Sequence, residues 1–264
     1  MKNKKFIMFS SSTLFLILIL TIGLCVGSFL NVLIYRLPRE ISFIKGRSFC
    51  PKCKKKISWF DNIPLFSYLR LGGKCRYCRS FISLRYPIVE VLSSILFLLT
   101  FNQIGLNLIN LILSFVLISG LLIVFFIDLE HQIIPDCVIF PLAILFLLFF
   151  LFTGCRLLVI NNLISAIGAS LFLFLIWIAT KGKGMGMGDV KLAFLLGLVL
   201  GFPKTLVAVY FAFLTGAIVG IILILVKKAK FGQKIPFGPF LSAATIVTYL
   251  WGERIISLAR KIIF

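Results

Sequence analysis

The sequence predicts an all-α, polytopic membrane protein with about eight transmembrane helices and one cytoplasmic loop that carries pairs of cysteines. Hydrophobic residues make up 61% of the 264 residues, and the mean hydropathy of +1.13 is well above that of a soluble globular domain. Apolar runs of about 20 residues recur along the chain, and this is the length that crosses a bilayer as a helix. The charged residues, 14% of the chain, fall mostly between these runs.

The expected spans follow the apolar runs. Lysines precede the first run as in a secretory signal, but the run is too long for one and no small-residue cleavage site follows. We therefore interpret it as an uncleaved first span. A turn signal at Gly201-Phe202-Pro203 divides the region 190–226 into two spans. The expected spans are 13–35, 87–101, 106–127, 137–153, 157–179, 190–202, 204–226 and 236–258.

The distribution of basic residues predicts the orientation. A net charge of +20 would indicate nucleic acid in a soluble chain, but here the positive residues lie in short loops between spans. We expect these residues to set the orientation of the spans in the membrane and to contact anionic lipid headgroups. We expect no nucleic-acid partner. Loop 36–86 carries 13 Lys and Arg against two acids, which places it in the cytoplasm together with 128–136, 180–191 and 227–235. The expected location is the bacterial cytoplasmic membrane, with both termini outside.

Four of the seven cysteines form two C-x-x-C pairs in the large loop, Cys50 with Cys53 and Cys75 with Cys78. The 21 residues between the pairs are close to the spacing of a zinc ribbon. Neighbouring Lys and Arg favour thiolates, and a cytoplasmic location disfavours disulfides. We expect a structural Zn²⁺ that folds the loop and leaves no coordination position for catalysis. The alternative is a set of reduced or transiently oxidised thiols. The other three cysteines are expected to be small core residues: Cys25, Cys137 and Cys155.

Two acidic segments at the edges of apolar runs hold four of the eight Asp and Glu residues. In segment 127–136, Asp128 ends an expected helix, where the macrodipole disfavours negative charge. A carboxylate at membrane depth costs about 2.5 to 3.5 kcal/mol, so Asp128 indicates a functional site. Asp136 follows Pro135 and precedes an apolar run, which is an N-cap context, and we interpret it as structural. We expect His131, the only histidine, to be solvated in a loop.

In the second segment, 184–191, glycines alternate immediately before Asp189. The pattern differs from a phosphate-binding loop, so nucleotide binding is not favoured. Such a backbone lets a substrate chain pass beside Asp189, whereas the simpler interpretation is a linker whose aspartate caps the next helix. Two spans separate Asp128 from Asp189, so both should lie on the same, cytoplasmic side. Two carboxylates in a poorly hydrated site share a proton and can activate a water, which indicates a membrane aspartyl protease.

Several stretches together match the pattern of one family. They are 27–38, the two cysteine pairs with 59–64 between them, 85–90, 128–136, 186–191 and 235–240. On these motifs the chain resembles, over nearly its full length, the bacterial type IV prepilin peptidases, which are bifunctional leader peptidases and N-methyltransferases.

The resemblance implies that Asp128 and Asp189 are the catalytic pair of a membrane aspartic endopeptidase. The substrates would be type IV prepilins or pseudopilins of pilus assembly or type II secretion, whose basic leader is cut after a glycine at the cytoplasmic face. The new N-terminal residue, usually Phe, would then be methylated from S-adenosylmethionine. We expect residues 1–86 to form the first span and the methyltransferase loop, and 87–264 the peptidase core. Gly73, beside the third cysteine of the loop, is the candidate for cofactor binding.

Three alternatives stay open. The first is a peptidase without methyl transfer. Family members that lack the cysteine loop are often peptidases only, so the presence of the loop favours methylation here. A transporter with paired intramembrane acids would show internal repeats, and no convincing repeat is present in the sequence. A structural subunit of a secretion machine would tolerate Asp→Asn at both positions.

Overall fold

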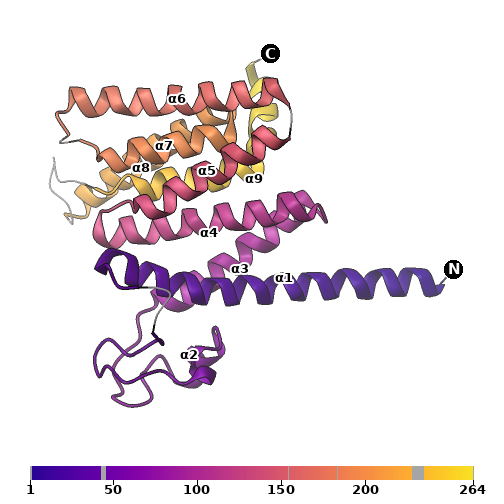
Figure 1. Ribbon diagram of the computed structural model, residues 1–264, viewed down its shortest axis with the longest axis vertical. Helices are drawn as coiled ribbons and strands as arrows, with labels where there is room; N and C mark the ends of the chain where they lie inside the picture. Colours follow the sequence, from indigo (N-terminus) through magenta and orange to yellow (C-terminus); the bar gives the residue numbers. More distant parts are fainter. Residues whose placement is uncertain (1, 43–45, 154, 183, 228–234, 264) are drawn as a thin grey trace. The chain divides into compact units, whose positions relative to one another are not determined.

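The computed structural model describes residues 2–42, 46–153, 155–182, 184–227 and 235–263, and these are predominantly helical (Figure 1). Besides the helices, the described residues contain two isolated β-bridges and no longer strand. The predicted all-α class is therefore confirmed. The chain forms two compact units, Met1–Leu122 and Ile123–Phe264.

In the first unit, α1 (Lys2–Arg36) packs closely against α3 (Arg85–Ile104) (Figure 1). A Cβ atom at Gly23 would lie only 2.5 Å from the Cα atom of Ser94, so the two backbones meet at a glycine. The Ser93 hydroxyl donates to the Gly23 carbonyl oxygen at 2.7 Å. Small residues and hydroxyl groups at a helix crossing are typical of membrane helix pairs, where close packing replaces the hydrophobic driving force.

The loop between α1 and α3 is held by polar contacts. It contains η1 (Leu37–Arg39), η2 (Trp59–Asn62) and α2 (Phe66–Arg70). The buried Glu90 of α3 accepts a hydrogen bond from the Leu65 backbone N–H at 2.9 Å. The buried Arg36, the last residue of α1, donates to three backbone carbonyl oxygens at the start of the loop. Arg76 pairs with both carboxylate oxygens of Asp61, at 2.8 and 2.6 Å. The loop is thus fastened to the ends of two membrane helices.

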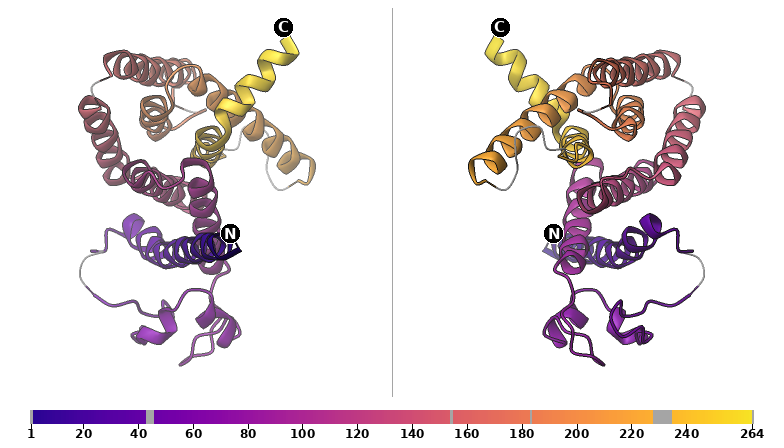
Figure 2. Two further views of the ribbon diagram at one scale, coloured as in Figure 1. Left: turned by 90° about the vertical axis from the view of Figure 1, so that its right-hand side faces the viewer. Right: turned by 90° about the vertical axis from the view of Figure 1, so that its left-hand side faces the viewer.

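The second unit is arranged around α7. Helix α4 (Leu108–His131) begins in the first unit and ends in this one, and five helices follow it: α5 (Asp136–Phe152), α6 (Arg156–Ala179), α7 (Met187–Leu200), α8 (Lys204–Leu225) and α9 (Gly238–Ile263). Ten of the 14 residues of α7 are buried, and α7 contacts α5, α6, α8 and α9. A Cβ at Gly197 would lie 2.5 Å from the Ala166 Cα, which explains how closely α6 and α7 run side by side (Figure 1). Helices α8 and α9 cross (Figure 2).

Each of the eight expected spans coincides with a helix, and the turn at Gly201–Pro203 separates α7 from α8 as predicted. In the described part of the chain, five helices are long and apolar enough to cross a membrane. They are Thr13–Arg39, Arg85–Ile104, Leu108–His131, Arg156–Ala179 and Lys204–Leu225. Helix α5 is apolar but shorter. The chain therefore has the helices of a multi-pass membrane protein, whereas eight crossings, which need α5, α7 and α9, stay a prediction.

The prediction that three single cysteines are core residues is wrong. Cys25, Cys137 and Cys155 are all exposed on the surface of the protein. An apolar run in a membrane helix contains residues that face lipid as well as residues that face other helices. Apolar neighbours in the sequence therefore do not distinguish the two environments.

Candidate active site

The first candidate aspartate lies in the last turn of α4. Asp128 is 5% exposed, and its helix ends three residues later at His131. Gln132 then adopts a left-handed backbone conformation, with φ of 55°, and its N–H donates to the Asp128 carbonyl oxygen at 2.9 Å. The chain thus turns sharply directly after the aspartate. This turn directs Ile134 back toward the site.

The second candidate aspartate lies in the first turn of α7. The backbone N–H of Gly186 donates to Asp189 Oδ2 at 3.0 Å, and Asp189 is 5% exposed. Gly188 lies directly against Ile134, because a Cβ at Gly188 would be 2.8 Å from the Ile134 Cβ. A glycine is needed at this point for the two acidic segments to meet. The Asp189 carboxylate also caps its own helix, α7. The simpler sequence interpretation, a linker whose aspartate caps the next helix, therefore describes part of its role.

Both aspartates line one pocket of about 210 Å³. The carboxylates are close enough for their negative charges to repel one another. Within the described residues, Asp128 Oδ2 and Asp189 Oδ1 are buried and have no hydrogen-bond partner. The other lining residues are Gln132, Ile134, Gly184, Met185, Gly186, Gly188, Ile235, Pro236 and Phe237. Two residues that are 61 positions apart in the sequence are thus brought together, each with one oxygen available for a water or a carbonyl group.

A third segment completes the pocket, and we did not predict it as part of the site. Gly238, the first residue of α9, lies against Asp128, since a Cβ there would be 2.6 Å from Asp128 Oδ2. The backbone N–H of Gly238 interacts with the same carboxylate. Both aspartates therefore lie at the positive end of a helix dipole, which stabilises negative charge. The Gly-Pro motif at 235–240 could have indicated this part of the site, but in the sequence it supported only the family resemblance.

Asp136 makes a structural contact other than the predicted helix cap, and His131 lies in a helix and not in a loop. Asp136 is the first residue of α5 and makes no capping hydrogen bond, because Pro135 occupies the N-cap position. Its two carboxylate oxygens instead contact Lys191 Nζ at 2.9 and 2.8 Å, so the residue joins the start of α5 to α7. This ion pair supports a structural role by another route. His131 is the last residue of α4 rather than a loop residue, and its Nε2 atom lies 4.0 Å from Glu130 Oε2.

The four loop cysteines form a candidate metal centre in the first unit. The Sγ atoms of Cys50, Cys53, Cys75 and Cys78 all lie within 4.8 Å of one another. Tetrahedral zinc with Zn–S bonds of about 2.3 Å has S–S edges of about 3.8 Å. The Cys50 and Cys78 sulfurs are 3.8 Å apart, which fits this geometry. A hydrogen bond from the Ser80 hydroxyl lowers the pKa of the Cys78 thiol to about 6. The donor set thus suits a tetrahedral, thiophilic metal ion.

The two cysteine pairs lie in similar turns, which explains how the cluster forms. The Cys50 N–H donates to the Lys55 carbonyl, and the Cys75 N–H donates to the Ser80 carbonyl, at 3.0 and 2.8 Å. An isolated β-bridge flanks each turn, one between Phe49 and Lys56 and the other between Lys74 and Phe81. Each turn presents its two sulfurs on one side, as a metal knuckle requires.

Gly73 lies next to this cluster and has a backbone role. Its φ angle of +67° favours glycine, and its N–H donates to the Tyr68 carbonyl at 2.9 Å. A Cβ at this position would be 3.0 Å from the Tyr68 hydroxyl. Its predicted contact with a cofactor stays a prediction.

A helical membrane protein that holds two buried carboxylates in one pocket has the architecture of an intramembrane aspartic peptidase. Residues 21–104 match the model of the bacterial Peptidase A24 N-terminal domain, and residues 115–221 match that of the type IV leader peptidase family. The second match contains both Asp128 and Asp189. The chain belongs to the type IV leader peptidase family.

Three similar proteins carry the name prepilin leader peptidase/N-methyltransferase. The one from Pseudomonas aeruginosa is 33% identical, over 91% of this chain and 92% of the relative. The one from Aeromonas hydrophila is 36% identical, over 92% of each chain. The one from Bacillus subtilis is 34% identical, over 90% of this chain and 95% of the relative. No solved structure matches this chain.

Proposed function

We propose that this protein cleaves the leader peptide of type IV prepilins or pseudopilins with the Asp128–Asp189 pair, and then methylates the new N-terminus from S-adenosylmethionine. The observation that carries the proposal is the single pocket with two buried carboxylates, each of which has an unpartnered oxygen. The names of the relatives and the family match support the same two reactions.

The pair would act by acid and base catalysis on one water. Two close carboxylates bind one proton between them, so one is the base and the other the acid. The ionised carboxylate takes a proton from the water, whose oxygen attacks the scissile carbonyl carbon, while the protonated one donates to the carbonyl oxygen. The tetrahedral intermediate then collapses. Its C–N bond breaks, the leaving amine takes the proton that the first carboxylate removed from the water, and the hydroxyl proton of the intermediate returns to the second carboxylate. Gly186, which lines the pocket and has no side chain beside Asp189, would let the substrate backbone pass there.

The methyl transfer belongs, in this proposal, to the loop of the first unit. S-adenosylmethionine carries a methyl group on a sulfonium sulfur. The newly freed amine, in its neutral form, would attack the methyl carbon, the C–S bond would break with S-adenosylhomocysteine as the leaving group, and the methylated nitrogen would release a proton to water. Cys50, Cys53, Cys75 and Cys78 would hold a structural Zn²⁺ that folds the loop, and Gly73 is the candidate for the contact with the methyl donor. The distribution of Lys and Arg supports a location of both the loop and the aspartate pair on the cytoplasmic side of the bacterial cytoplasmic membrane.

Product mass tests both reactions in one experiment. Membranes that contain the protein should release the leader from a prepilin and, when S-adenosylmethionine is added, add the mass of one methyl group to the product. Without the methyl donor, cleavage should continue and the added mass should be absent. Cleavage without any methylation of the product would show that the protein is a peptidase without methyltransferase activity. Failure to cleave any prepilin would favour a transporter or a structural subunit instead.

Gly238→Ala should lower cleavage by about tenfold to 100-fold at normal abundance in the membrane. The new Cβ would lie 2.6 Å from Asp128 Oδ2, so the Asp128 carboxylate must leave its present position in the pocket. Cleavage rates in membranes, normalised to protein amount, measure the effect. Gly168→Ala is the matched control, because a Cβ there meets no atom within 4 Å. Equal rates for the two variants would contradict the contact between α9 and Asp128.

A further inference from the structure

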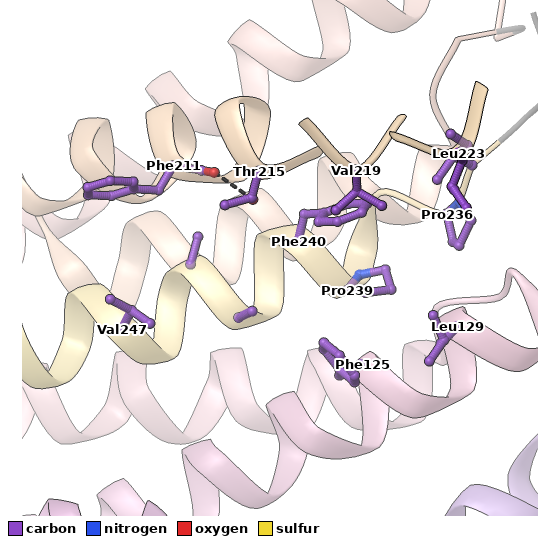
Figure 3. A pocket seen from close by; sticks show the side chains of 13 residues that line it. Phe125, Leu129, Phe211, Thr215, Val219, Leu223, Pro236, Pro239, Phe240 and Val247 are labelled. Atoms are coloured by element: carbon purple, nitrogen blue, oxygen red, sulfur yellow. Dashed lines mark hydrogen bonds between the residues drawn. The ribbon is translucent and has the colours of Figure 1, made fainter. Parts of the chain in front are cut away.

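A second, larger cavity of the second unit is an apolar groove of about 510 Å³ (Figure 3). Its walls come from α8 and α9, and Phe125 and Leu129 of α4 lie across from them. The one hydroxyl group in its lining, on Thr215, donates to the Phe211 carbonyl of its own helix at 2.7 Å. The lining residues are Phe125, Leu129, Phe211, Thr215, Val219, Leu223, Ile235, Pro236, Pro239, Phe240, Ala243, Ala244 and Val247. The groove therefore suits hydrocarbon and offers no polar recognition.

The groove adjoins the aspartate pocket. Ile235 and Pro236 line both cavities. From there the groove follows α9 from Pro239 to Val247, a length of about 12 Å at 1.5 Å per residue. A chain whose peptide bond lies between the two aspartates would thus have an apolar path beginning at the site of cleavage.

The groove is also accessible from outside. Leu129 and Val247, which lie at its margins, are 53% and 42% exposed. The side chains of the described residues therefore do not close it. In a membrane such a groove is filled by hydrocarbon, either from a lipid chain or from an apolar peptide.

We propose that this groove binds the apolar segment that follows the scissile bond of the substrate. The proposal rests on the proposed cleavage reaction. The expected first residue after the cut, Phe, is apolar, and the groove begins at the wall that the two cavities share. Within a bilayer, an apolar partner is bound mainly by close packing, because both partners are already out of water. The aromatic rings of Phe125 and Phe240 offer surfaces for such packing. The groove thus aligns the substrate so that the bond before its apolar segment enters the aspartate pocket.

Filling the groove with a large side chain tests the proposal. Thr215→Trp fills it from α8 and breaks no hydrogen bond to another helix, because the Thr215 hydroxyl bonds only within α8. Leu214→Trp is the matched control, since Leu214 is the preceding residue, is 40% exposed and does not line the groove. Val247→Trp repeats the test from α9. Two substrates are compared, one with the full apolar segment and a short soluble peptide that ends soon after the cleavage site.

The expected result is selective. Thr215→Trp and Val247→Trp should lower kcat/KM for the long substrate by at least about tenfold and leave the short peptide nearly unchanged. Leu214→Trp should affect neither substrate. Normal cleavage of the long substrate by both groove variants, or an equal loss on both substrates, would overturn the proposal and assign the groove to lipid or to the shape of the pocket. If the wild-type protein cuts neither substrate, the proposed function itself fails.

Discussion

Asp128→Asn and Asp189→Asn should each lower leader cleavage by at least about 1000-fold at normal abundance in the membrane. Asparagine keeps the size and shape of the side chain but can neither accept the proton from water nor donate one to the carbonyl oxygen. Both carboxylates are buried in one pocket and interact with each other, so the loss of either removes the shared proton. The measurement is the rate of leader release from a prepilin in membranes, with the product identified by mass.

Asp136→Asn is the matched control for these variants. It removes a carboxylate from the same acidic segment, but Asp136 pairs with Lys191 and does not line the pocket. We expect cleavage within a few fold of wild type. If Asp128→Asn or Asp189→Asn cuts at the wild-type rate, that residue is not catalytic, and Asp136 becomes the next carboxylate to test.

The aspartate pair could be predicted because acidic residues are rare in this chain and are costly in a membrane. An even number of spans between Asp128 and Asp189 predicts that they lie on the same side of the membrane, where they can meet, and the structure has them in one pocket. The cysteine cluster could be predicted as well, because each C-x-x-C pair presents two sulfurs from one turn and a tetrahedral metal site needs four.

The neighbours of the aspartates could not be predicted in the same way. Gly238 reaches Asp128 only because α9 begins at that point, and Ile134 reaches Gly188 only because Gln132 turns the chain. These contacts depend on the directions of helices, which hydropathy does not specify. Asp136 was assigned to a cap on local sequence, whereas its partner, Lys191, lies 55 positions further on. The exposure of Cys137 could not be predicted for the same reason, because an apolar run does not show which face of its helix packs against protein.

Replacing one cysteine of each pair, as in Cys53→Ser with Cys78→Ser, should remove bound metal and abolish methyl transfer. The four sulfurs are the only tight metal-ligand cluster among the described residues, and the loop around them has little other regular structure. In small domains of this kind the free energy of metal binding, about 10 to 16 kcal/mol in zinc-finger peptides, largely drives folding. Wild type should contain one zinc per chain by elemental analysis, and the double variant close to none. The basic loop should then become sensitive to trypsin.

Cys137→Ser is the control, because Cys137 is an exposed thiol on α5 outside the cluster, and neither metal content nor methylation should change. Cleavage should fall less than methyl transfer in the double variant, because every residue of the aspartate pocket belongs to the second unit and every cysteine of the cluster to the first. Full methylation by a metal-free double variant would show that the loop does not need the metal. Equal loss of both reactions would show that the peptidase depends on the folded loop, and the two activities could then not be assigned to separate parts of the chain.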